Sequence, residues 1–569
     1  MTPSHCSEPD RTSPDRFRWD HQRVAQVFDR FNDPDPPASV RQFAREHDIP
    51  RSTLGHWLRQ DPPEDLDPNL VAFFRSSSGL ALLRRVVLAL FLVFLFRASC
   101  GLRSLGLFLR LTQLDRFVAS SHGALHELAG AIEADLGAFS DQERVRLGEG
   151  LAARDIALVA DEHFHADQPC LVAIEPASNF ILVEQYADRR DAATWTTVIT
   201  AALEGLPLTA VLLTSDQAKG LICCAGEGLQ AQHLPEMFHG QRDLAAPFTG
   251  PLQRCKEAAE KELREAEEML QYWRDEKAKA QAQRRPGRPL DCDWRIDIYV
   301  RWVAHRAEEV AACEARQQQA KDAVRGLADD YHPFDPGTGA VVSAADMRRR
   351  LDKHLGTLKD VARKAELGSK ATAALAKAQQ WTGALVAAVG WFWTVAATKV
   401  EEMDLPEQAE QAVNEELLPG LYWQQAARRG RIAEDRQHKE ELAQRLLKQA
   451  WRKGGALSQL PKQRRQEVQR VAKEVVGLFC RSSSCVEGRN GRLSLLHHGQ
   501  CRLSAGRLKA LTTVHNYLVE RPDGTTAAQR FFGQEPRDLF TWLLQRLPDL
   551  PRPAAKRPRK EPLAALLPE

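Results

Sequence analysis

Three short apolar runs lie close together in the middle of the chain. They occupy residues 156–161, 170–175 and 180–186, of which the first ends in Asp161 and the second in Glu175. Ser178-Asn179 supplies a turn between the second and third runs. Short apolar runs separated by turn residues are typical of paired strands. The pattern therefore predicts three antiparallel strands.

A helix and a fourth strand follow these three runs. Asp191 can open a helix that reaches Leu203 and turns Trp195 and Ile199 inward. Residues 210–216, AVLLTSD, then predict a fourth strand that ends in an aspartate. Three strands, a helix and a strand form the opening order of a ribonuclease-H-like fold.

From about residue 250 to 475 the strand patterns stop and helical ones take over. Apolar residues recur at intervals of 4, 3, 4 and 3 at Ala259, Leu263, Ala266, Leu270 and Trp273. This spacing fits a coiled-coil seam, and a long solvated helix in a bundle explains it equally well. Residues 381–397 are apolar nearly all round, which predicts a buried helix.

The N-terminal part predicts a helix-turn-helix unit at 16–60. Val40 and Phe43 would face inward on a first helix, residues 48–50 would form the turn, and Ser52 would cap a second helix. The exposed start of that second helix would meet a major groove. Its expected DNA contacts are Arg51, Ser52, Thr53 and His56. An ordinary helical hairpin is the alternative.

Residues 69–150 predict a helical domain around the run VVLALFLVFLF at 86–96. Eleven apolar residues are too few for a membrane span, which needs roughly 20, so a buried helix is expected and no membrane association. The expected domains follow in chain order. They are a disordered N-terminus (1–15), a DNA-binding domain (16–60), a helical domain (69–150), the first part of the sheet core (151–249), a helical insertion (250–475), the second part of the core (476–548) and a disordered basic tail (549–569).

The composition of the chain restricts the class of protein but gives no evidence for a particular binding partner. The 569 residues include 78 Lys+Arg and 76 Asp+Glu, so a net charge of +2 gives no basic excess over the whole chain. The eleven cysteines include no Cys-x-x-Cys pair, which argues against a zinc site and fits reduced thiols. We expect a mostly helical α+β protein of the cytoplasm.

Two aspartates stand where predicted strands end. Asp161 and Asp216 would converge if their strands are neighbours, and paired carboxylates suit Mg²⁺ or Mn²⁺. Two such ions about 4 Å apart would activate an attacking oxygen and stabilise a leaving one in phosphoryl transfer. A third carboxylate is normally needed. Its candidates are Glu227, Glu236, Glu257 and Glu487.

Glu487 has the most favourable local sequence of the four. Residues 482–484 are three serines that can cap a helix, on which Glu487 and Asn490 lie three apart on one face. Arg489 and Arg492 follow closely and could bind phosphate. We therefore favour Glu487 as the third carboxylate.

Several stretches together resemble a family of bacterial insertion-sequence transposases of the DDE type. They are DEHFH (161–165), CLVAIEPASNFILVEQY (170–186), LLTSDQAKG (212–220), MFHGQRDL (237–244), SSSCVEGRN (482–490) and NYLVERPDGTTAAQRFF (516–532). The resemblance implies a ribonuclease-H-like core interrupted by a long helical insertion before its final glutamate. It also implies that Asp161, Asp216 and Glu487 hold two Mg²⁺ or Mn²⁺ ions.

The same resemblance sets the expected activity. The protein would cleave DNA at the terminal inverted repeats of a mobile element and join the freed ends to target DNA, acting at the nucleoid as a homodimer or higher oligomer. Arg489 and Asn490 would touch DNA or orient Glu487, and Arg492 would touch DNA. His239 is a possible support of the core, with a buried structural histidine as the alternative.

Three other readings stay open. The chain could be an inactive or domesticated copy that only binds DNA, or another ribonuclease-H-like nuclease. A coiled-coil scaffold would explain residues 255–280 and leave the two strand-terminal aspartates unexplained.

Overall fold

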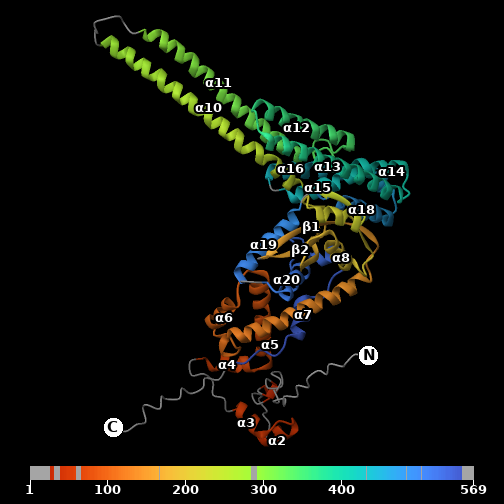
Figure 1. Ribbon diagram of the computed structural model, residues 1–569. Coiled ribbons are helices and arrows are strands. Elements are labelled where there is room, and N and C mark those ends of the chain that lie inside the picture. Colours follow the sequence, from red (N-terminus) through yellow and green to blue (C-terminus); the bar gives the residue numbers. More distant parts are fainter. Residues whose placement is uncertain are drawn as a thin grey trace, which may run out of the picture. The chain divides into compact units, whose positions relative to one another are not determined.

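A computed structural model describes residues 26–553 of the chain, except for 28, 31–38, 59–65, 166, 283–290, 431, 482 and 501–502. The segments predicted to be disordered, 1–15 and most of 549–569, lie outside the described residues. The protein is mostly helical, with 71% helix and one five-stranded mixed sheet. This confirms the predicted α+β class (Figure 1).

Contacts divide the chain into two units. The first joins Met1–Gly150 to Gly491–Glu569, and the second is Leu151–Asn490. We had expected residues 476–548 to complete the sheet core. The division falls inside that segment, because α20 (Ala505–Tyr517) packs on α7 (His122–Gly148) within the first unit. Residues after Asn490 therefore belong with the N-terminal helices.

The sheet lies in the second unit. Its strands are β1 (Arg154–His165), β2 (Gln168–Glu175), β3 (Phe180–Tyr186), β4 (Leu208–Ser215) and β5 (Gln232–Pro235), in the order β3-β2-β1-β4-β5. β1, β2 and β3 are antiparallel neighbours, whereas β4 and β5 run parallel to β1. Four strands were predicted. β5 was missed because its four residues, two polar ones followed by Leu and Pro, give too weak a pattern.

One predicted strand end is wrong. β1 does not stop at Asp161 but continues to His165, because pairing with β2 extends to the pair His165 and Gln168. Pairing with β4 ends earlier, at Val159 and Thr214. Asp161 thus lies just past the point where β1 loses one of its two neighbours.

The second unit also contains a large set of helices. They are α8 (Ala192–Leu203), α9 (Lys219–Cys223), α10 (Met237–Ala282), α11 (Cys292–Asp330), α12 (Ala344–Lys364), α13 (Ser369–Glu401), α14 (Glu407–Ala412), α15 (Leu418–Arg429), α16 (Ala433–Ala450), α17 (Ala456–Gln459), α18 (Lys462–Gly477) and the start of α19 (Ser484–Gln500), with π-helical turns at Cys224–Gly228 and Val413–Leu417.

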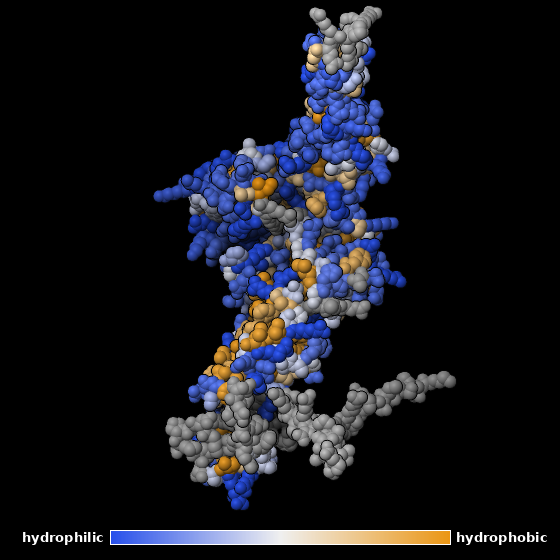
Figure 2. All heavy atoms as spheres, turned by 90° about the vertical axis from the view of Figure 1, so that its left-hand side faces the viewer, coloured by the Kyte–Doolittle hydropathy of each residue, from blue (hydrophilic) through white to orange (hydrophobic). Residues whose placement is uncertain are grey.

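Helices α10 and α11 form a long antiparallel hairpin, here called the arm (Figure 1). Ala266 and Leu270 of the predicted seam are buried, and α10 and α11 pack on each other along the arm. The face of the arm in Figure 2 is largely hydrophilic, although Trp294, Val300 and Trp302 of α11 are exposed. The linker predicted at 284–289 lies outside the described residues.

The insertion and the sheet share one hydrophobic core. Ala157 of β1, Leu212 of β4 and Leu234 of β5 belong to the same buried cluster as Leu385 and Phe392 of α13. The prediction of a buried helix at 381–397 is confirmed. The insertion is therefore packed on the sheet, and burial of this apolar area stabilises both together.

The regular elements in the described part of the first unit are helices, and one isolated β-bridge joins Glu520 and Thr526. The helices of this unit are α2 (Val40–Glu46), α3 (Arg51–Leu58), α4 (Pro68–Arg75), α5 (Ser77–Leu90), η1 (Phe91–Arg97), α6 (Leu102–Leu111), η2 (Leu114–Arg116), α7, the remainder of α19, α20, α21 (Ala527–Phe532) and α22 (Leu539–Arg546). Phe139 of α7 contacts Tyr517 and Trp542, with ring centroids 5.4 and 5.2 Å away. These contacts between distant segments hold the unit together.

Helices α2 and α3 form the predicted helical pair, with a small core that includes Phe43, Ile49 and Leu54. One detail is wrong. Ser52 does not cap α3, because the helix begins one residue earlier, at Arg51, after Pro50. The fixed φ angle of proline suits a helix start.

Two helical segments of the described chain are long and apolar enough to cross a membrane by length and composition, namely Ser77–Arg97 and Ser369–Glu401. The first contains the predicted apolar run, in which Val87, Leu88 and Phe91 are fully buried. Buried core helices pass the same test, so these segments are weak evidence for a membrane.

Candidate active site

Two acidic residues lie next to each other just beyond the ends of neighbouring strands. Asp216 follows β4 and Glu236 follows β5, and the last residues of these parallel strands, Ser215 and Pro235, are paired. The Glu236 N–H donates to the Ser215 carbonyl at 2.8 Å. Parallel strands end at the same edge of a sheet, so the two acidic residues begin from adjacent positions there.

Asp161 reaches the same edge from β1. It lies two residues beyond Val159, whose partner Thr214 is two residues before Asp216. Burial raises the pKa of Asp161 to about 6, and the nearby charge of Asp216 contributes in the same direction. The predicted convergence of the two aspartates is thus present in the structure.

Helix α19 brings in Glu487 and Asn490. Its first turn is fixed by the Ser483 carbonyl, which accepts from the Glu487 N–H at 3.0 Å. One turn later, Asn490 Nδ2 donates to Asp161 Oδ2 at 2.8 Å. Glu487 and Asn490 share a helix face as predicted, and that face is turned toward the aspartate.

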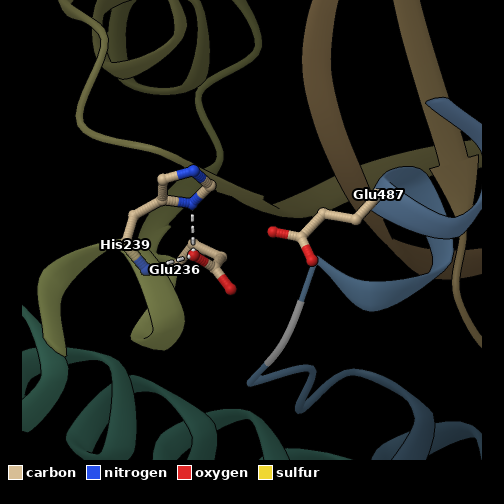
Figure 3. A group of neighbouring side chains, drawn as sticks. All are labelled: Glu236, His239 and Glu487. Carbon is tan, nitrogen blue, oxygen red and sulfur yellow. Dashed lines mark hydrogen bonds and ion pairs between the residues drawn. The ribbon is translucent and has the colours of Figure 1, made fainter. Parts of the chain in front are cut away.

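A second group at this edge consists of Glu236, His239 and Glu487 (Figure 3). Glu236 Oε2 accepts from the His239 backbone N–H at 2.7 Å and lies 2.6 Å from His239 Nδ1. One ligand atom from each of the three residues lies within 4.8 Å of the others. Sequence reasoning weighed Glu236 against Glu487 as the third carboxylate, whereas the structure brings both to the site.

His239 is 30% exposed, so it is not the fully buried structural histidine of the alternative reading. Its charge interacts with Asp161 and favours the ionised form of that carboxyl. The signal that could have found the pair is the spacing Glu-x-x-His at a helix start, where the glutamate can bond the backbone and the side chain of the histidine.

For Arg489 the two expectations were a contact with DNA and an orienting role for Glu487, and only the first needs a correction. Its side chain is 3% exposed and bonds both carboxylate oxygens of Glu184 on β3, at 2.6 and 2.5 Å. Two residues along a helix turn by about 200°, so Arg489 faces away from Glu487. It fastens α19 to the sheet and is not accessible to DNA.

The remaining predicted DNA contacts lie in the first unit. Arg492 Nη2 donates to the carbonyl of Arg97, the last residue of η1, at 2.6 Å. Arg51 and Ser52 are exposed on α3 and Thr53 is half-buried. The side chain of His56 lies outside the described residues.

A cavity of about 620 Å³ opens beside the site, at the base of the arm. Its lining includes Phe238, the residue before His239, which is 55% exposed. Arg242, Lys321 and Arg325 also line it and are exposed. An exposed aromatic ring among cationic side chains is a surface that suits nucleic acid.

Negative charge dominates the sheet edge itself. Across the described part of the chain, no lysine or arginine forms an ion pair with Asp161, Asp216, Glu236 or Glu487, and His239 is the one basic partner of Glu236. Buried or half-buried carboxylates require a counter-charge. Oxygen-rich sites of this kind suit divalent cations.

The comparisons with known proteins add one finding. A family model described as a family of unknown function, DUF6399, matches residues 413–559. That stretch contains Glu487 and Asn490 but neither Asp161 nor Asp216. No curated protein matches the chain, and no solved structure does.

Proposed function

We propose that the protein is a DDE-type transposase that cleaves DNA at the ends of a mobile element and transfers the strands into target DNA. The observation that carries the proposal is that Asp161 and Asp216 interact electrostatically at one edge of the sheet, where Asn490, which shares a helix face with Glu487, donates a hydrogen bond to Asp161. Asp161, Asp216 and Glu487 are widely separated in the chain, and each comes from a different element.

The topology supports a ribonuclease-H-like catalytic core. The sheet order β3-β2-β1-β4-β5, with β2 antiparallel to β1 and α8 between β3 and β4, is the arrangement expected for that fold. The long helical insertion lies between β5 and α19, so it interrupts the core before Glu487. This is the organisation that the sequence resemblance implies.

The chemistry of the site fits the divalent ions that such a reaction requires. Asp161, Asp216 and Glu487 would hold them, with oxygen ligands that Mg²⁺ and Mn²⁺ both accept. When bound, two such ions supply Lewis-acid activation of the attacking oxygen and stabilisation of the leaving oxygen.

The other side chains position these ligands. The Asn490 amide orients Asp161 through its 2.8 Å hydrogen bond. The Arg489–Glu184 pair holds α19 in register on β3, and thereby sets the position of Glu487. Fixed ligands of this kind reduce the reorganisation needed when a phosphate group arrives.

DNA would be recognised by other parts of the chain. Helix α3, with exposed Arg51 and Ser52, suits the terminal inverted repeats, as a recognition helix enters a major groove. The cationic cavity at the base of the arm suits the strand next to the scissile phosphate. Two ends must be held together, so a homodimer or higher oligomer at the nucleoid is expected.

The experiment is a cleavage and strand-transfer assay with full-length protein, Mg²⁺ or Mn²⁺, and DNA that carries the element's own ends. Asp216→Asn and Glu487→Gln should each abolish cleavage and leave end binding intact. Glu257→Gln, on the exposed surface of α10, is the matched control and should cleave normally.

Two results would reject the proposal. Binding without cleavage in the unmodified protein would indicate an inactive or domesticated copy that only binds DNA. Cleavage that ignores the end sequence, or that acts on RNA or branched DNA, would indicate a different nuclease.

A further inference from the structure

We infer that Glu236, His239 and Glu487 form a site for a divalent transition-metal ion, such as Mn²⁺ or Zn²⁺, in which the imidazole of His239 is a direct ligand. The site shares Glu487 with the proposed reaction centre. Its role in cleavage therefore rests on the proposed function, whereas the binding of the ion does not.

The geometry comes from three separate elements. Glu236 follows β5, His239 lies in the first turn of α10 and Glu487 in the first turn of α19. In Figure 3 the carboxylate of Glu487 faces the Glu236–His239 pair. The three ligand atoms lie within 4.8 Å of one another, close to the about 4.2 Å between opposite ligands on an ion with bonds of about 2.1 Å.

The electrostatics of the group require a cation. The Glu236 side chain is 1% exposed, and His239 is its one basic partner among the described residues. The carboxylate of Glu487 has no hydrogen-bond or ion-pair partner in the described part of the chain. Two carboxylates facing each other with a single imidazole leave an excess of negative charge, which is costly at a partly desolvated site.

A second observation lies next to the carboxylates. Asn490 is 9% exposed and its Oδ1 has no hydrogen-bond partner among the described residues, although its Nδ2 bonds Asp161. Buried amide oxygens are normally satisfied by a donor, a water or an ion. This orphaned acceptor lies one turn beyond Glu487, on the same helix face.

The donor set indicates which ions would bind. Carboxylates alone suit Mg²⁺, whereas an imidazole nitrogen favours transition metals. Coordination would use His239 Nδ1, so the proton shared between Nδ1 and Glu236 Oε2 would move to Nε2 or leave to solvent. The backbone N–H of His239 can keep its bond to Glu236 and hold that carboxylate in place.

The test uses full-length, tag-free protein stripped with EDTA, with Mn²⁺ alone as the probe. Electron spin-echo spectroscopy should show ¹⁴N modulation from a coordinated imidazole. His239→Gln should abolish that modulation and weaken Mn²⁺ binding at least about 10-fold. His305→Gln, an exposed histidine on α11, is the matched control and should change neither quantity.

The variant Glu236→Gln distinguishes metal coordination by Glu236 from the hydrogen bond that Glu236 accepts from the His239 backbone at the start of α10. Glutamine can still accept the His239 N–H bond, so the thermal unfolding of the ion-free protein should change little while Mn²⁺ binding weakens. Absence of ¹⁴N modulation in the unmodified protein, or its persistence in His239→Gln, would overturn the inference.

The same preparations distinguish this inference from the proposed function. If nitrogen coordination is present and element ends are not cut, the metal site stands and the proposed function fails. If ends are cut while bound Mn²⁺ shows no nitrogen ligand, the function stands and this inference fails.

Discussion

Replacing Arg489 by methionine tests the most buried charge pair of the sheet unit. The side chains of Arg489 and Glu184 are 3% and 0% exposed. Arg489→Met removes the cation and leaves Glu184 charged inside the protein. Breaking a buried pair from one side costs about 3–5 kcal/mol. We therefore expect the free energy of unfolding to fall by about this amount.

The size of the thermal shift follows from the size of the unit. Leu151–Asn490 spans about 340 residues, which corresponds to an unfolding entropy of about 0.7 kcal/mol/K. A loss of 3–5 kcal/mol then lowers the Tm by about 4–7 °C. Differential scanning calorimetry at pH 7.5 in EDTA measures this shift.

Two further variants make the measurement specific. The double variant Arg489→Met with Glu184→Met should recover most of the loss, because no unpaired charge stays buried. Arg301→Met, which breaks an exposed pair with Asp297 on the arm, should change the Tm little. A shift below about 1 °C for Arg489→Met would refute the reasoning.

Two other predictions concern the site and its surroundings. Burial and the charge of Asp216 raise the pKa of Asp161 to about 6, so the stability that this group contributes at pH 4 is lost as the pH rises through 6. Asp161→Asn should therefore stabilise the ion-free protein by up to about 3 kcal/mol at pH 8 and hardly at pH 4, as measured by urea titration. Equal effects at both pH values would contradict the raised pKa of Asp161. In Gly240→Ala the new Cβ would lie 2.4 Å from a ring carbon of buried Trp381, so the free energy of unfolding should fall by about 1–3 kcal/mol. In the control Gly250→Ala the new Cβ meets only the flexible end of a side chain, so the protein should keep its stability. Equal thermal unfolding of both variants would refute this prediction.

Local patterns in the sequence predicted most of the strands and several helices. Short apolar runs predicted four of the five strands, and helical spacing predicted the helix opened by Asp191 and the seam of the arm. These features depend on periodicity within a short segment, which the chain carries by itself. The pairing of Glu487 with Asn490 also needed only the helical repeat.

The environment of Arg489 is a feature that local sequence patterns did not predict. Its position two residues after Glu487 already implied a different helix face. What that face meets is Glu184 on β3, and no local pattern links these two residues. A basic residue beside Glu487 therefore suggested a DNA contact, whereas the tertiary structure buries it in an ion pair.

The sequence determined which segments become strands and helices, and it singled out Asp161, Asp216 and Glu487 as candidates. Only the tertiary structure decided that β5 delivers Glu236 beside Asp216 and that His239 joins Glu487. It also decided that the chain after Asn490 packs with the N-terminal helices. Local periodicity specifies elements, whereas the site and the unit boundaries arise from long-range burial between segments that no short pattern connects.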